Sequence, residues 1–226
     1  ALNVLAKDTS VAAIVLAANG PVFCAGHDLK EMTAHRTDAD GGRAFFAETM
    51  TSCARMMQEI VNSPKPVIAA VQGLATAAGC QLVASCDLAV AANEARFATP
   101  GVQIGLFCSS PMVALSRNVP RKHAMEMLLT GEAISAGAAA KYGLINRTVA
   151  APEVMGAALG MARTIASKSK ATVAFGKAAF YRQLEMPLEE AYTYAAGIMV
   201  KNMMSADAEE GICAFLEKRS PVWKDA

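Results

Sequence analysis

Residues 69–82 read Ala-Ala-Val-Gln-Gly-Leu-Ala-Thr-Ala-Ala-Gly-Cys-Gln-Leu, a run in which apolar residues give way to small ones. It continues an apolar run that begins at Pro66, and after Gly73 small residues lead into the first turn of a helix. Small residues let a ligand approach the backbone closely, and the first N–H groups of a helix have no partner within it. The pattern predicts a buried strand, a turn, and a helix N-terminus that can hold negative charge.

A second turn of the same kind lies upstream. Residues 22–29 read Val-Phe-Cys-Ala-Gly-His-Asp-Leu, a short apolar run that ends in small residues around Gly26. Two backbone donors from separate loops are what an enzyme needs to stabilise an oxyanion. The two turns together favour an enzyme site built from main-chain N–H groups.

Composition narrows the class of protein. The 226 residues suit one large domain or a domain with a helical appendage, and the 54% hydrophobic content predicts buried subunit interfaces. No apolar run approaches the ~18 residues of a membrane span. The net charge of +1, with scattered Lys and Arg, is not typical of a nucleic-acid-binding protein. We therefore expect neither a nucleic-acid partner nor membrane insertion.

Cysteine usage indicates a reducing compartment. The six cysteines, at positions 24, 53, 80, 86, 108 and 213, form no C-x-x-C pair, and only three histidines accompany them. This pattern predicts no metal site and buried, reduced thiols, which favours a cytoplasmic protein.

Hydrophobic periodicity predicts an α/β body. Val11–Ala18, Val67–Val71 and Leu88–Ala92 are apolar runs typical of buried strands, and a helix over 79–85 separates the last two. Strand, helix, strand in this order predicts parallel pairing. Apolar residues spaced by three or four predict an amphipathic helix over 39–62, which Ser63-Pro64-Lys65-Pro66 stops.

The second half of the chain is predicted to be mostly helical. Pro120 opens a helix that Gly131 closes, Ser135 caps a short one, and 144–149 is the last expected strand. Beyond Pro152 the pattern predicts helices over 153–168, 171–184, 187–203 and 205–219, in addition to two turns of helix over 1–7.

The two turns, at 22–29 and 69–82, resemble segments of the enoyl-CoA hydratase/isomerase (crotonase) family, and so do three later segments. They read Phe-Ala-Thr-Pro at 97–100, Glu-Met-Leu-Leu-Thr-Gly-Glu at 126–132 and Ala-Glu-Glu-Gly-Ile-Cys-Ala-Phe-Leu-Glu-Lys-Arg at 208–219. The resemblance covers nearly the whole chain. It implies an α/β crotonase spiral of β-β-α units over 1–150 and a C-terminal helical trimerisation region over 151–226.

The resemblance also implies features around this core. Family members form trimers, often paired into hexamers, and carry two strands and most of a helix ahead of the position of Ala1. A targeting segment there would make the protein mitochondrial. The family acts in fatty-acid metabolism on acyl-CoA thioesters, so acyl-CoA is the expected partner and no separate cofactor is expected.

By resemblance, the oxyanion donors are the backbone N–H groups of His27 and Ala78, which would hold a thioester carbonyl as it becomes an enolate. The residues expected to bind CoA are Cys24, Ala25, Asp28, Leu29 and Lys30, with Phe215 and Lys218 on the last helix. Asp28 is equally suited to cap the helix that begins at Leu29, and the apolar face around Phe215 favours core packing. Asp87 is expected to be structural.

Two positions depart from the family pattern. Gln81 and Gly101 stand where hydratases carry their two catalytic glutamates. A glutamine amide orients water but does not take its proton near neutral pH. Replacement candidates are the His27 side chain as acid/base and Cys108 as nucleophile, whereas His35 and His123 are expected to be surface residues without partners.

These residues leave more than one function open. The first is an acyl-CoA-binding enzyme, by family a lyase of the enoyl-CoA hydratase/isomerase class, that stabilises a thioester enolate. The alternatives are an acyl-CoA hydrolase or decarboxylase variant, and a non-catalytic acyl-CoA-binding pseudoenzyme that serves as a sensor or assembly partner.

Overall fold

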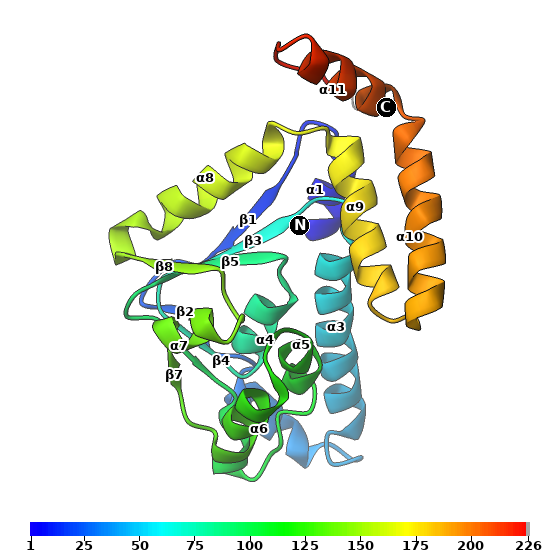
Figure 1. Ribbon diagram of the computed structural model, residues 1–226. Helices are drawn as coiled ribbons and strands as arrows, with labels where there is room; N and C mark the ends of the chain where they lie inside the picture. The colour runs from blue at the N-terminus through cyan, green and yellow to red at the C-terminus, as the bar shows by residue number, and fades with distance from the viewer. Residues whose placement is uncertain (225–226) are drawn as a thin grey trace. The chain divides into compact units, whose positions relative to one another are not determined.

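The computed structural model describes residues 1–224 (Figure 1). The chain divides into two compact units. The larger unit comprises Val15–Val61 and Val67–Leu159, and the smaller comprises Ala1–Ile14, Asn62–Pro66 and Gly160–Ala226. Helix α8 (Val154–Ala166) passes from one unit into the other.

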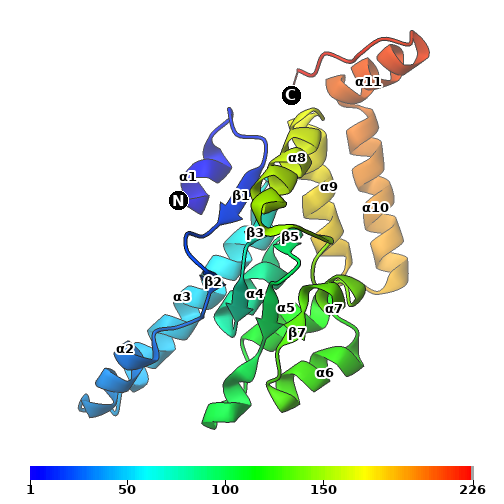
Figure 2. The same cartoon turned by 90° about the vertical axis from the view of Figure 1, so that its left-hand side faces the viewer.

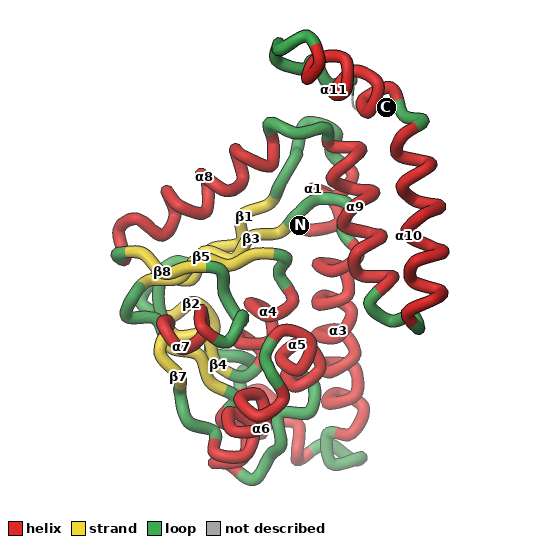
Figure 3. The backbone as a smooth tube through the Cα atoms, viewed as in Figure 1, coloured by secondary structure: helices red, strands yellow, loops and turns green. Residues whose placement is uncertain are grey.

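The larger unit contains two four-stranded sheets. The first has the order β1-β3-β5-β8, with strands β1 (Ile14–Ala17), β3 (Val67–Val71), β5 (Leu88–Ala92) and β8 (Arg147–Val149) (Figure 3). β3 is buried along its whole length and pairs in parallel with β5. The parallel pairing predicted for these two runs is therefore confirmed, with the same bounds.

Both outer strands of this sheet are shorter than predicted. The buried strand expected over 11–18 is reduced to Ile14–Ala17, and only Ile14 is buried. The strand expected over 144–149 is reduced to Arg147–Val149. Both lie at an edge of the described sheet, so each has a strand neighbour on one side only, whereas an apolar run by itself does not distinguish an edge from a centre.

The second sheet was not identified by periodicity. It has the order β2-β4-β6-β7, with strands β2 (Val22–Cys24), β4 (Leu74–Thr76), β6 (Arg96–Ala98) and β7 (Ile134–Ser135). The first three pair in parallel and β7 is antiparallel to β6. Strands of two or three residues carry too few side chains to show an alternation. The two mainly parallel sheets and their helices agree with the α/β fold expected from the resemblance.

The helices of the larger unit pack around these sheets. They are α2 (Leu29–Ala34), η1 (His35–Thr37), α3 (Arg43–Asn62), α4 (Ala78–Ser85), η2 (Pro100–Ile104), α5 (Pro111–Asn118), α6 (Arg121–Thr130), α7 (Ala136–Lys141) and η3 (Ala151–Glu153). α3 begins four residues later than predicted, after Gly41 and Gly42, which both adopt positive φ. The predicted C-terminus of α6 is confirmed, since Gly131 closes it at φ 68°. The predicted cap of α7 is also confirmed, since Ser135 Oγ accepts the Ala138 N–H at 3.2 Å.

The smaller unit is helical apart from its loops. It contains α1 (Leu2–Lys7), the second half of α8, α9 (Lys170–Gln183), α10 (Leu188–Met203) and α11 (Ala206–Leu216). α9 and α10 lie side by side in both views (Figures 1 and 2). The predicted helices are confirmed to within three residues at each end. None of the described helices has the length and hydropathy needed to cross a membrane.

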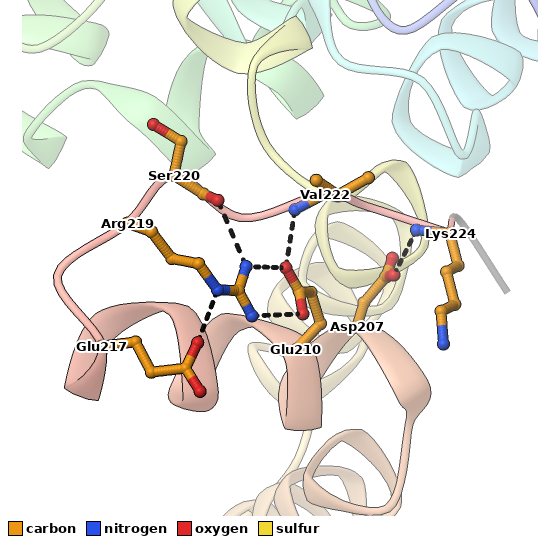
Figure 4. A network of polar contacts seen from close by, with 7 residues as sticks. All are labelled: Asp207, Glu210, Glu217, Arg219, Ser220, Val222 and Lys224. Atoms are coloured by element: carbon orange, nitrogen blue, oxygen red, sulfur yellow. Dashed lines mark hydrogen bonds and ion pairs between the residues drawn. The ribbon is translucent and has the colours of Figure 1, made fainter.

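The chain beyond α11 folds back onto that helix (Figure 4). Glu210 accepts two hydrogen bonds from the Arg219 guanidinium, at 2.6 and 3.0 Å, and one from the Val222 N–H at 2.8 Å. Asp207, only 1% exposed, accepts from Ser169 Oγ and from the Lys224 N–H, both at 2.6 Å. Two carboxylates of one helix thus hold the terminal segment.

Residues 217–224, which follow α11 and are called the tail below, also carry the single tryptophan of the sequence. Trp223 Nε1 donates to the Ser167 carbonyl at 2.9 Å, and its ring lies 3.2 Å from where a Cβ on Gly211 would stand. Tryptophan fluorescence therefore reports whether this tail is docked.

Acid is expected to release the tail. The hydrogen bonds from Arg219 and Val222 lower the pKa of Glu210 from 4.5 to about 2. Because the folded pKa lies below the unfolded one, this contribution to stability is complete above pH 4.5 and is lost as pH falls toward 2. We expect Trp223 emission to shift to longer wavelength over that range. Glu210→Gln should already show the shifted emission at neutral pH, and an identical titration in both proteins would contradict the assignment.

Candidate active site

The two small-residue turns selected from the sequence meet at one end of the second sheet. β2 and β4 are parallel neighbours, so the loops that follow them leave from the same edge. A Cβ on Gly26, where φ is +95°, would lie 3.1 Å from Ala77 Cβ and 3.3 Å from the Ala78 nitrogen. The loop after β2 therefore packs directly against the first turn of α4.

Ala77 holds this junction in a strained backbone conformation. Its φ of 52° and ψ of −119° lie in a region that L-residues rarely adopt, at a cost of about 1–3 kcal/mol. Hydrogen bonds on both sides maintain it, since its N–H donates to the Ala98 carbonyl at 3.0 Å and its carbonyl accepts from the Gln81 N–H at 3.1 Å. The strain sets the direction of the next peptide N–H, that of Ala78.

The N–H groups of His27 and Ala78 are the two predicted donors. Ala78 is the first residue of α4, and within residues 1–224 neither N–H donates a hydrogen bond to another protein atom. An unpaired N–H at a helix N-terminus attracts negative charge. Two such donors on adjoining loops are chemically suited to hold one anionic oxygen.

Gln81 lies one turn further along α4 and is only 5% exposed. The Cys53 thiol of α3 contacts its Oε1 at 3.9 Å, and burial raises the pKa of that thiol. A neutral amide and a protonated thiol thus occupy this side of α4. Neither takes a proton readily near neutral pH.

Gly101 is enclosed by the segment that follows it. A Cβ at this position would lie 2.8 Å from the Leu106 carbonyl oxygen and 2.9 Å from Cys108 Sγ. The Gly101 N–H donates to the same sulfur at 3.3 Å. A larger side chain at position 101 therefore requires the backbone of the following turn to move.

The predicted CoA-binding residues of the larger unit run from the last residue of β2 through the following loop into the start of α2. Cys24 is partly buried, whereas Ala25, Asp28, Leu29 and Lys30 are exposed. The capping role of Asp28 is confirmed, since its Oδ1 accepts the Lys30 N–H at 2.8 Å and the Glu31 N–H at 3.3 Å. Their role in CoA binding stays a prediction.

Phe215 and Lys218 belong to the smaller unit, at the end of α11 and just beyond it. The interpretation of Phe215 as a core residue is wrong, because its side chain is 82% exposed. Lys218 is also exposed and has a φ of 56°. Their predicted contact with CoA stays a prediction.

Other side-chain expectations are partly corrected. Asp87 is structural as predicted, since its Oδ2 accepts the Val67 N–H at 2.7 Å. His35 is not without a partner: its Nδ1 lies 2.7 Å from Asp38 Oδ2 and its ring stacks on Phe45. His123 stacks in the same way on a tyrosine ring. Cys213, on α11, is exposed rather than buried.

Thr99 is a residue of this region that the sequence analysis did not select. Its side chain is fully buried, and its Oγ1 has no hydrogen-bond partner among the described residues. It directly follows Ala98, whose carbonyl holds the Ala77 N–H. A buried hydroxyl without a partner costs about 1–3 kcal/mol, a signal that appears only in the structure.

Thr99→Val is expected to raise stability by about 1 kcal/mol. Valine keeps the shape of threonine and removes the unpaired hydroxyl, so the cost of burying it disappears. The urea midpoint of unfolding should increase without a change in slope. A decrease of the midpoint would mean that Oγ1 has a partner in solution.

The described residues offer no candidate metal site. Across residues 1–224, His, Cys, Asp and Glu side chains form no group of three or more that could share a metal ion.

Comparisons with known proteins identify the family. The sequence profile of the enoyl-CoA hydratase/isomerase family matches residues 1–226. The chain belongs to this family, and its fold is the crotonase fold. This confirms the resemblance from which the site was predicted.

Individual relatives agree with this assignment. The chain is 51% identical over 218 residues to the mouse protein named mitochondrial enoyl-CoA hydratase domain-containing protein 3, covering 96% of this chain and 71% of the relative. It is 37% identical over 218 residues to carnitinyl-CoA dehydratase of Escherichia coli, covering 94% of this chain and 80% of that protein. The crystal structure of an enoyl-CoA hydratase of Mycobacterium smegmatis superposes with a TM-score of 0.93 at 53% identity, covering 98% of this chain and 84% of that chain.

Proposed function

We propose that this protein binds an acyl-CoA thioester and stabilises its enolate through the N–H groups of His27 and Ala78. The observation that carries the proposal is the pair of unpaired donors on adjoining loops, one of them at the start of α4. The thioester oxygen accepts both hydrogen bonds, and these strengthen as a proton leaves Cα and negative charge moves onto oxygen. Each such donor lowers the barrier by about 3–4 kcal/mol.

The proton-transfer group is not a carboxylate at position 81 or 101. Gln81 is buried and neutral, so its role is to orient substrate or water. The His27 side chain is partly buried on the loop that supplies one N–H donor, and imidazole exchanges protons near neutral pH. We therefore assign the acid/base role to His27 within the proposal. Acyl-CoA is the substrate and no further cofactor enters the scheme.

The enolate is common to several reactions of acyl-CoA thioesters. Water addition, double-bond shift and decarboxylation all pass through charge on the thioester oxygen. One relative is named a dehydratase, so removal of water belongs in the same set. We place the protein in this class, with fatty-acid metabolism as its setting.

The test uses acyl-CoA thioesters in heavy water. Purified protein is incubated in D2O with saturated, enoyl, hydroxyacyl and malonyl-type CoA thioesters, and their masses and retention times are followed. Enolate formation exchanges Cα hydrogens for deuterium even where no net reaction occurs. Gain or loss of water, loss of carbon dioxide or release of CoA then names the reaction. Binding without any exchange or turnover contradicts the enzyme proposal.

A second candidate function follows from Gln81 and the enclosed Gly101. Without either carboxylate, the fold can serve as a non-catalytic acyl-CoA sensor or assembly partner. This hypothesis predicts that calorimetry detects acyl-CoA binding while the deuterium experiment shows no exchange. Exchange that depends on His27 excludes it.

Assembly and location complete the proposal. The exposed apolar side chains of α10 and α11 support a homo-oligomer, either a trimer or a dimer of trimers; they stand at positions 188, 192, 199, 200, 203, 212, 215 and 216. Light scattering on the purified protein tests this. The mouse relative at 51% identity is named mitochondrial, which supports a mitochondrial location and gives no support to the expected cytoplasmic one.

A further inference from the structure

The turn that begins at Gly101 closes on its own first residue. The Gly101 carbonyl accepts the Leu106 N–H at 2.9 Å, and the Gly105 N–H also points to this oxygen. On the other side, the Gly101 N–H donates to Cys108 Sγ at 3.3 Å. Both backbone groups of Gly101 are thus bound by residues 105–108, and the Cys108 thiol covers the position where a side chain would begin.

This turn is attached to the first turn of α4. The strand that precedes it ends at Ala98, whose carbonyl holds the Ala77 N–H at 3.0 Å. On the helix, burial raises the pKa of the Cys80 thiol to about 12, and the nearby Cys108 sulfur contributes in the same direction. Cys80 stands two residues after Ala78. The chain thus runs in three residues from Ala98, which is bound to the start of α4, to Gly101, which is bound to the Cys108 sulfur.

Resting on the function proposed above, we propose that Cys108 is a specificity-determining residue whose side chain fills the space beside Gly101 and keeps reactive water out of the site. Hydration requires a water oxygen to bond to Cβ of an enoyl thioester while a proton goes to Cα. With a thiol against Gly101, no carboxylate stands there to activate a water. Without added water, the enolate held by the two N–H groups forms when a C–H proton next to the thioester passes to the His27 imidazole, and it is discharged when that imidazole returns the proton to carbon.

The chemistry of the thiol suits this role. Cys108 is 8% exposed, and a buried cysteine behaves as a small apolar side chain with only weak hydrogen bonding. Its sulfur satisfies the Gly101 N–H without offering water a strong partner. The thiol and the Leu106 carbonyl oxygen together fill the space beside Gly101, and the thiol also holds the turn in place through the Gly101 N–H.

The test restores the missing carboxylates with and without the thiol. We expect Gln81→Glu/Gly101→Glu to hydrate crotonyl-CoA no faster than wild type, because Cys108 and the Leu106 carbonyl occupy the place of the new side chain. Adding Cys108→Ala removes the sulfur and the hydrogen bond through which it ties the turn to Gly101, so the Leu106 carbonyl can move aside. Hydration should then increase by at least roughly tenfold, since a positioned acid/base contributes 10²–10⁴-fold. The matched control adds Cys213→Ala, an exposed thiol on α11, and should behave like the double variant.

Acyl-CoA binding and deuterium exchange, measured on the same variants, distinguish the role of Cys108 from the proposed function. If all variants bind acyl-CoA and exchange deuterium at Cα, but the triple variant hydrates no faster than the double, the Cys108 role is wrong. Equal gains in both variants also overturn it. If neither wild type nor variants bind acyl-CoA in calorimetry, the proposed function itself fails.

A stability cycle tests the contact when the glutamate variants do not fold. Gly101→Ala should lower Tm in wild type, because its Cβ would lie 2.9 Å from Cys108 Sγ. The same change should lower Tm less in a Cys108→Ala background, where that sulfur is gone. Equal decreases in the two backgrounds would show that Cys108 does not fill this space.

Discussion

Gly79→Ala is expected to destabilise the larger unit by about 3 kcal/mol. A Cβ on Gly79 would overlap the Cys24 carbonyl oxygen and lie 2.7 Å from its carbon and 2.8 Å from Cys24 Cβ. The obstacle is mainly backbone at the end of β2, so no side-chain rotation relieves it. Urea unfolding followed by circular dichroism should show a clear decrease of the midpoint.

The matched control is another helical glycine. Gly176, in the middle of α9, has open space within 4 Å of the point where a Cβ would stand, and alanine there should stabilise the helix by up to about 1 kcal/mol. Opposite signs for the two changes are the expected result. If Gly79→Ala unfolds at the same urea concentration as wild type, α4 does not rest on β2 as described.

The close packing of Gly79 against Cys24 also positions the candidate active site. Because Gly79 has no side chain, the first turn of α4 lies against Cys24, and the loop that follows Cys24 passes beside Ala78. Two main-chain donors are thereby brought together by packing alone. Side chains contribute little to this part of the site, which explains why small residues mark it in the sequence.

The first sheet could be predicted because its central strands are long and apolar throughout. Val67–Val71 is fully buried, and both its bounds and its parallel partner follow from the pattern. The strands of the second sheet have two or three residues and are defined by partners far along the chain, as in the pairing of Leu74 with Arg96. Only the resemblance to a known family indicated them.

For the site, the sequence predicts which residue types are present but not what surrounds them. Gln81 could be recognised as a departure, yet its neighbour Cys53 stands 28 positions away. Gly101 could be recognised as lacking a side chain, but the thiol and carbonyl that enclose it come from the folding of the next turn. The unpaired hydroxyl of Thr99 is likewise a consequence of tertiary packing.

The absence of catalytic glutamates at positions 81 and 101 makes the two backbone N–H donors more important to the proposed function. In the proposed scheme, with no carboxylate at position 81 or 101, more of the rate acceleration is assigned to the N–H groups of His27 and Ala78. A main-chain donor is not removed by changing a side chain, except by proline. Ala78 is the first residue of α4, the helix position that tolerates proline best, so there the donor can be removed without breaking the helix.

Ala77→Gly/Ala78→Pro is expected to decrease deuterium exchange or turnover of acyl-CoA by about 10²–10³-fold relative to Ala77→Gly alone. Proline restricts the residue before it, and glycine at position 77 accepts the positive φ of 52° that alanine holds under strain. The single variant is therefore the correct reference, and its stability should be at least that of wild type. Tm should differ little between the two variants, because the lost N–H has no protein partner among the described residues. A double variant that folds, binds acyl-CoA and exchanges Cα hydrogens at the reference rate would show that the Ala78 N–H does not stabilise the enolate.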